Sequence, residues 1–224
     1  MVEQVKRSYR SERRAEQAAA TRTAVLRAAR EHFVERGYAA TAVAGIAASA
    51  GVNVDTVYRS VGRKPQLLLA VIDMALAGTD EPVVAEQRDY VQAVLAAEGA
   101  RAKLETYADA LGRVMPRVAP LFDSLAQAAL TEPDCADLRD SIGERRRANM
   151  LKLAVDLRAT GDLRDDLDDD EVADLLWTTN SPEHYALAVA RGWSADTYAR
   201  RTGDLWARLL LADPLQGSEV ASSG

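Results

Sequence analysis

A short run near the front of the chain, GVNVDTVYRSVGRK from Gly51 to Lys64, carries the side chains best suited to polar chemistry. Tyr58 offers a phenol, Arg59 a guanidinium and Ser60 a hydroxyl, and Lys64 adds an ammonium at the end of the run. Each of these groups can donate a hydrogen bond to an anionic oxygen. The run therefore predicts contacts to phosphate.

The elements that must position these groups are two short helices, expected at residues 42–50 and 54–60, with Thr41 as the N-cap of the first. Gly51 lies between them and supplies a turn conformation that few residues tolerate. Two short helices joined by a tight glycine turn form a helix-turn-helix. The residues expected to seat one helix on the other are Ile46, Ala47, Ala50, Val52 and Val57.

The second helix keeps its other face free, and that face predicts a partner. The N-terminal residues of a recognition helix reach base edges in the major groove of double-stranded DNA. Residues that follow, and the N-terminus of the next helix, contact phosphate and set position. Asp55 could accept from a cytosine amino group or instead cap its helix. The predicted DNA-binding residues are Thr41, Val54, Asp55, Thr56, Tyr58, Arg59, Ser60 and Lys64.

The charge of the chain is divided unevenly. Up to Lys64 there are twelve Lys and Arg residues against six Asp and Glu, which leaves +6. The remaining chain holds 16 basic and 28 acidic residues, or −12, within an overall net charge of −6. A basic head on an acidic body indicates that a polyanion meets the head, although ordinary surface charge could produce the same tilt.

Several function classes find no support in the sequence. The single cysteine, Cys135, permits no intrachain disulfide, and the two histidines, His32 and His184, lack the partners of a metal site or a catalytic triad. We expect no metal, no cofactor and no enzyme. No apolar run approaches the roughly 20 residues of a membrane helix, and the N-terminus lacks a signal peptide, so a cytoplasmic protein without membrane contact is expected.

Composition and periodicity predict an all-α fold. Helix formers dominate, and runs typical of strands are missing. The expected order is a disordered basic arm at 1–17, a helix-turn-helix domain at 18–64, a helical domain at 65–215 and a disordered tail at 216–224. Within the helical domain we expect helices over about 83–97 and 100–114, Pro116 and Pro120 at the entry to a further helix, a long helix over about 134–159, and an acidic loop before residue 171.

The motif resembles the DNA-binding domain of the TetR family of transcriptional regulators. The resemblance covers roughly residues 20–72 and departs from the family pattern at Ser60 and Val61, where aromatic residues are frequent. The matching residues are Phe33, Gly37 and Tyr38, then Ile46-Ala47, Ala50-Gly51-Val52, Thr56-Val57-Tyr58, Lys64 and Leu67-Leu68.

The resemblance implies a helical domain for ligand binding and dimerisation after the DNA-binding head. The last two helices would pair with their mates, through apolar faces that could alternatively pack within one subunit; these faces hold Leu175, Leu176, Leu187, Val189, Tyr198, Leu205, Trp206, Leu209 and Leu210. A lipophilic small-molecule inducer would need an apolar pocket with few polar groups. The candidates, which could equally be ordinary core, are Tyr90, Tyr107, Met115, Phe122, Asn149, Trp177, Asn180 and His184.

The sequence thus predicts a homodimeric, sequence-specific regulator that binds an operator in double-stranded DNA, a repressor released by a small molecule. A ligand-independent activator or accessory regulator of the same fold is the first alternative. An α-helical enzyme with the same head is the second.

Overall fold

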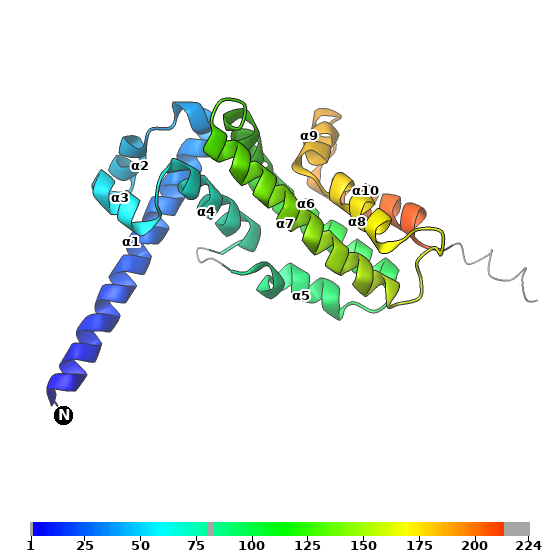
Figure 1. The fold of residues 1–224 in the computed structure, drawn as a ribbon, viewed down its shortest axis with the longest axis horizontal. Helices are drawn as coiled ribbons and strands as arrows, with labels where there is room; N and C mark the ends of the chain where they lie inside the picture. Colours follow the sequence, from blue (N-terminus) through cyan, green and yellow to red (C-terminus); the bar gives the residue numbers. More distant parts are fainter. Residues whose placement is uncertain (1, 80–82, 213–224) are drawn as a thin grey trace, which may run out of the picture. The chain divides into compact units, whose positions relative to one another are not determined.

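The computed structural model describes residues 2–79 and 83–212, and the tail expected at 216–224 lies outside them. The regular structure of these residues is helical, which confirms the all-α prediction (Figure 1). No helix in this part of the chain is long and apolar enough to cross a membrane. The elements are α1 Val2–Ala40, α2 Val43–Ser49, α3 Val54–Ser60, α4 Lys64–Ala77, the 3-10 turn η1 Ala85–Gln87, α5 Asp89–Ala96, α6 Ala100–Ala128, α7 Pro133–Arg158, α8 Asp169–Thr179, α9 Pro182–Ala190 and α10 Ala195–Leu210.

The fold divides into two compact units, and this division corrects the expected boundary at residue 64. The first unit combines the chain up to Val83 with Pro120–Arg139, and the second combines Val84–Ala119 with the chain from Asp140 onward. The helix after the motif, α4, belongs to the first unit because Leu67, Leu68 and Val71 are fully buried there.

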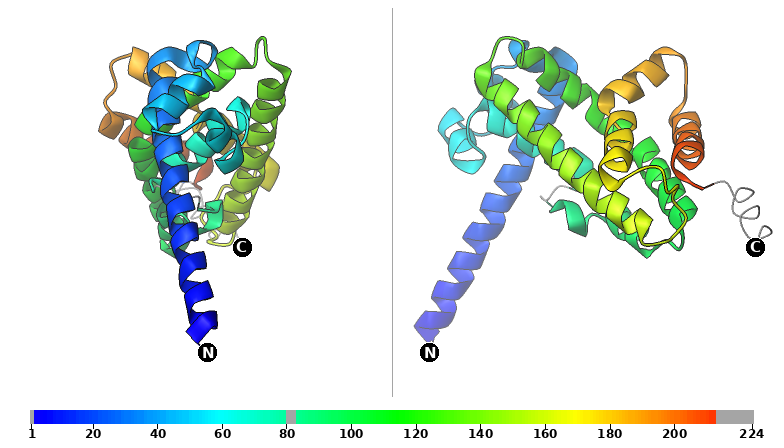
Figure 2. Two further views of the ribbon diagram at one scale, coloured as in Figure 1. Left: turned by 90° about the vertical axis from the view of Figure 1, so that its left-hand side faces the viewer. Right: turned by 45° about the vertical axis from the view of Figure 1, so that its right-hand side comes forward.

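The first unit is built around α1. In Figure 2 this helix is a long ribbon whose second half is surrounded by α2, α3 and α4, each of which contacts it. Residues 2–17 belong to α1, so the expected disordered arm is wrong. The segment holds four Arg, three Glu and two Gln residues and neither glycine nor proline, and such a composition favours helix even where no apolar period exists. Gly37, with φ of 72°, interrupts the helical dihedrals near the end of α1.

The helix α6 corrects a second expectation, because it continues through Pro116 and Pro120. Each proline lacks the amide that would donate to the preceding turn, a loss of about 3 kcal/mol in a helix interior. Burial of a large apolar side chain contributes about 1.5–3 kcal/mol. A buried stripe runs past both prolines and outweighs their cost; it consists of Leu111, Val114, Met115, Val118, Leu121 and Leu125.

The second unit holds α6 against α10 at a close crossing. A β-carbon on Gly112 would lie 2.9 Å from the β-carbon of Ala199 and 3.1 Å from the carbonyl oxygen of Ala195, so only glycine fits. The predicted acidic loop ends in a capping box, in which Asp168 and Glu171 each accept from the other's backbone amide and start α8. The helix expected over about 83–97 is shorter, because η1 precedes α5.

The residues expected at a dimer interface fall into three groups. Leu176, Tyr198, Trp206 and Leu210 are fully buried within the subunit. Leu175, Leu205 and Leu209 are half-buried. Leu187 and Val189 on α9 are exposed, at 71% and 47%. For the first group, therefore, packing within one subunit is the correct interpretation.

Candidate nucleic-acid interface

The two helices of the motif form as predicted, and buried residues join them. Ile46 and Ala47 of α2 and Val57 of α3 are buried, while Gly51 between the helices has a φ of 67°. His32 of α1 also seats α2: its Nε2 lies 3.0 Å from the Ser49 hydroxyl, and its ring passes so close to Gly45 that a β-carbon there would lie 3.1 Å away. The orientation of α3 is thus fixed by packing against both α1 and α2.

The N-terminus of α3 is capped by Asn53, a residue that sequence reasoning missed. Its Oδ1 accepts from the Thr56 amide at 2.8 Å and from the Thr56 hydroxyl at 2.7 Å. Asp55, the expected alternative cap, lies in the first turn instead. Asparagine just before a predicted helix and three residues before Thr56 is a recognisable N-cap signal. The cap makes a short helix rigid at the end expected to meet bases.

The outer face of α3 carries three exposed residues, Asp55, Tyr58 and Arg59. Val54, Thr56 and Ser60 are half-buried beside them. The Thr56 hydroxyl donates to the Asn53 cap, and the Ser60 hydroxyl donates back to the Val57 carbonyl at 3.1 Å. The methyl group of Thr56 and the side chains of the exposed residues are therefore what this face offers to a base edge.

Thr41 does not belong to this surface. Its side chain is buried, and its hydroxyl lies 3.0 Å from the His32 carbonyl oxygen and 2.7 Å from that of Gly37. Ala42, not Thr41, is the N-cap of α2, without a side-chain hydrogen bond. Thr41 instead closes the interruption that Gly37 makes in α1, so its predicted contact to DNA through the side chain is wrong.

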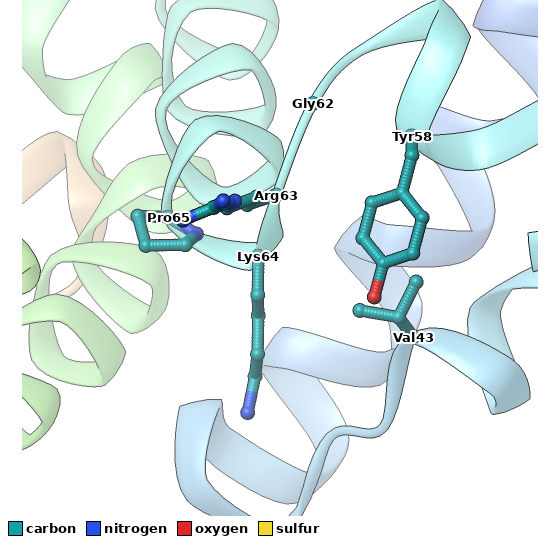
Figure 3. Close-up of a pocket in the computed structure, with 6 residues that line it drawn as sticks. All are labelled: Val43, Tyr58, Gly62, Arg63, Lys64 and Pro65. Carbon is teal, nitrogen blue, oxygen red and sulfur yellow. The ribbon is translucent and has the colours of Figure 1, made fainter. Parts of the chain in front are cut away.

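Tyr58 and Lys64 border an open hollow of about 650 Å³ between α3 and the start of α4 (Figure 3). Figure 3 shows Tyr58 extending from α3 toward Val43 of α2, with the Lys64 side chain on the opposite side of the hollow. Arg63 and Gly62 complete the rim on the α4 side. The hollow thus lies between a phenol and an ammonium, both of which can donate to phosphate.

The ammonium of Lys64 lies 4.1 Å from the centroid of the Tyr38 ring. Burial lowers the pKa of Lys64, while the charge of Glu132, in the turn between α6 and α7, opposes that effect. Burial also raises the pKa of Tyr38, and a hydrogen bond with Cys135 adds to the increase. The Tyr38 ring therefore offers its face to the Lys64 side chain. The sequence placed Tyr38 in the motif but gave it no such role.

A second open hollow, of about 430 Å³, lies between α1 and α3. Arg14 and Gln17 of α1 face Thr56, Arg59 and Ser60 across it. A guanidinium of Arg22, one helical turn or more further along α1, donates to the Ser60 carbonyl at the end of α3. The basic N-terminal helix therefore extends the positively charged surface beyond α3.

The predicted ligand residues are brought together only in part. Tyr107 stacks on Tyr90 and on Trp206, with ring centroids 6.5 and 5.4 Å apart, and its hydroxyl accepts from the Asn180 amide at 2.9 Å. Met115 is buried, and Asn149, Trp177 and His184 are half-buried. Phe122 belongs to the first unit, whereas the other seven belong to the second. Within the described ranges, no group of three or more His, Cys, Asp or Glu residues could hold a metal ion.

Comparison with known proteins finds a family that matches the helix-turn-helix region. Residues 25–71 match the family described as bacterial regulatory proteins, tetR family. An HTH-type transcriptional repressor of Mycobacterium tuberculosis and an HTH-type transcriptional regulator of Mycobacterium bovis are each 37% identical over 135 residues. That match covers 59% of this chain and spans 64% of the length of each relative.

Solved structures share the fold over most of the chain. A TetR-family transcriptional regulator from a Rhodococcus species is similar at a TM-score of 0.67 and 17% identity, over 86% of this chain and 99% of its own. The SmeT–triclosan complex gives a TM-score of 0.66 at 17% identity, over 88% and 94%. The helix-turn-helix region at residues 25–71 therefore matches the tetR family of bacterial regulatory proteins, and the solved structures share the fold of most of the chain.

Proposed function

We propose that the protein is a homodimeric repressor that binds an operator in double-stranded DNA and leaves it when a small molecule binds. The observation that carries the DNA contact is the exposed face of α3, which is rigidly capped by Asn53 and flanked by Lys64. A related protein is named a repressor, which supports that sign of regulation. Members of this family are regulators and not enzymes, in agreement with the sequence prediction.

The position and exposure of the side chains on α3 and at the start of α4 indicate which contact phosphate and which contact base edges. Tyr58, Arg59 and Lys64 contact phosphate and set position, while Val54, Asp55 and Thr56, at the N-terminal end, contact base edges. A single seven-residue helix reads few bases, so two copies on successive major grooves are needed for operator specificity. The exposed Leu187 and Val189 of α9 favour the C-terminal helices as the dimer interface.

Ligand release requires differential affinity for two conformations, because a ligand with equal affinity for both shifts nothing. The SmeT structure contains triclosan, which supports a ligand site within this fold. We place the site in the second unit, near Tyr107 and Asn180, where buried polar groups face aromatic rings.

The experiment is fluorescence anisotropy of the full-length protein on DNA that flanks its own gene, titrated across salt. Lys64→Ala should weaken binding to every sequence and reduce the salt slope by about 1 per subunit contact. Lys152→Ala is the matched control, since this exposed lysine of the second unit pairs with Glu86 at 2.8 Å. Val54→Ala should instead change the preference between sequences. Equal behaviour of the two lysine variants would contradict the proposed interface.

A further inference from the structure

Arg146 of α7 is a half-buried cation that forms no ion pair within the described residues, although the charge of Glu183 on α9 acts on it at longer range. One nitrogen, Nη2, donates to the Asn180 side-chain oxygen at 2.6 Å and to the Trp177 carbonyl at 3.1 Å. No ion pair joins Arg146 to a carboxylate in residues 2–79 or 83–212. Arg147, the next residue, is more exposed and pairs with both Asp170 and Asp174 at 2.8 Å. A charge withdrawn from water is costly unless it is paired, so the lack of an ion pair at Arg146 among the described residues requires an explanation.

The ring of Trp177 faces the guanidinium, and further aromatic residues follow from it through Asn180 and Tyr198. Its central carbon lies 5.4 Å from the centroid of the Trp177 ring, and Asn180 links it onward to the buried hydroxyl of Tyr107. The charge of Arg146 acts on Tyr198 as well, whose ring is contacted edge-on by Tyr185 at 5.0 Å.

Two buried hydroxyls near the cation have spare hydrogen-bonding capacity. Tyr198 is fully buried and Thr202 is 1% exposed, and neither hydroxyl forms a hydrogen bond of ordinary geometry, although the two are neighbours. A buried hydroxyl without a partner costs about 1–3 kcal/mol. Retention of both hydroxyls, with Tyr198 within electrostatic range of a guanidinium that forms no ion pair among the described residues, is typical of a polar site that a ligand completes.

A purely structural role accounts for only part of the hydrogen-bonding capacity of Arg146. Trp177 and Asn180 are at the C-terminus of α8, where a cation satisfies free carbonyls and complements the helix dipole. That role uses Nη2 alone. Nε and Nη1 have no acceptor among the described residues, so each keeps an N–H that can donate to a carboxylate oxygen.

We propose that Arg146 binds the carboxylate of a small aromatic acid, with the ring of the acid packed among Trp177, His184 and Tyr185. Those three side chains are half-buried, so they can take a further ring without being displaced from a closed core. The carboxylate of the acid forms the ion pair that Arg146 lacks within the described residues. Its ring packs against the aromatic side chains of Trp177, His184 and Tyr185. The proposal deepens the proposed function, on which it rests, by naming the class of the ligand.

The test is isothermal titration calorimetry of the full-length protein without DNA, using benzoate, phenylacetate and 1-naphthoate, and the neutral isostere benzamide. At least one acid should bind saturably and about tenfold or more tighter than benzamide, the discrimination expected from a charged hydrogen-bond pair. Arg146→Gln should abolish that preference, and Arg147→Gln should leave it unchanged. Circular dichroism confirms that each variant folds.

Two results would overturn the site: wild-type protein that binds none of the three acids, or an Arg146→Gln variant that binds as tightly as the wild type. If Arg146→Gln fails to fold, Arg146→Lys keeps the charge but loses the guanidinium bonds to Asn180 and Trp177 that hold it in place, and it should bind several-fold more weakly; unchanged affinity would then overturn the site. DNA anisotropy with and without the acid separates this proposal from the previous one. Acid binding without DNA release keeps the site and contradicts ligand-controlled repression.

Discussion

The Asn53 cap on α3 allows a specific prediction, because one substitution removes the cap and leaves the residues of the helix itself unchanged. Asn53→Ala deletes the oxygen that accepts from the Thr56 amide and hydroxyl at 2.8 and 2.7 Å. Loss of an asparagine cap costs about 1 kcal/mol. A helix of seven residues with one buried side chain, Val57, has little else to oppose fraying.

The measurement is hydrogen–deuterium exchange of the peptide that covers α3. A loss of about 1 kcal/mol should raise the open population of the helix about fivefold, with a matching increase in the exchange rate. Tryptophan fluorescence would not report this change, because Trp177, Trp193 and Trp206 all belong to the second unit. Operator affinity should fall together with protection.

Asn53→Asp is the matched control. Its carboxylate keeps the acceptor and is favoured at a helix N-terminus, so the protection of α3 should remain at the wild-type level. DNA affinity should nevertheless fall, and more at low salt than at high salt, because a negative charge then faces phosphate. If Asn53→Ala left exchange unchanged, or if Asn53→Asp exchanged as fast as Asn53→Ala, the capping argument would be wrong.

Four further predictions test other parts of the structure. Gly51→Ala should lower the free energy of unfolding by about 1–2 kcal/mol through backbone strain alone, since open space surrounds its β-carbon position, and Gly51→Asn should cost less in the same thermal melt. Gly112→Ala should cost about 1–3 kcal/mol by overpacking against Ala199, and Ala199→Gly should recover part of that loss; simple additivity of the two would argue against the close crossing. Burial raises the pKa of Tyr198 to about 12, so stability should be fully present below pH 10 and fall as pH rises from about 10 to 12, a fall that urea titration should find reduced in Tyr198→Phe. Leu187→Asp should shift a dimer toward monomer in sedimentation velocity, whereas Leu130→Asp, at an equally exposed leucine of the first unit, should not; a dimer unaffected by both would remove α9 from the interface.

Local signals predicted the head well because each rests on chemistry within a few residues. Gly51 marks the turn between α2 and α3, and this signal does not depend on distant packing. Pro116 and Pro120 misled for the opposite reason. Their local cost is real, but the stripe that outweighs it is buried by partners far away in sequence, such as α10 against Gly112.

The candidate sites show the same limit. Helical spacing predicted which face of α3 is exposed, yet it could not show that the hydroxyl of Thr41 turns inward, because its acceptors are the carbonyls of His32 and Gly37. Arg146 looked like one of three consecutive arginines on a charged helix. Only tertiary structure reveals that Arg147 pairs with Asp170 and Asp174, whereas Arg146 forms no ion pair in the part of the chain that the structure describes.

The first unit, which carries the helix-turn-helix and is called the head below, is discontinuous in sequence. It includes Pro120–Arg139, from the C-terminal end of α6 and the start of α7. Ser124 donates to the Phe33 carbonyl at 3.0 Å, and Cys135 is fully buried beside Tyr38. On the ribosome, the head therefore cannot complete its packing until residue 139 has emerged. In a chimaera that exchanged only the first 83 residues between relatives, those residues would pack against residues 120–139 of the other protein. Operator preference should therefore transfer intact only when residues 120–139 are exchanged as well.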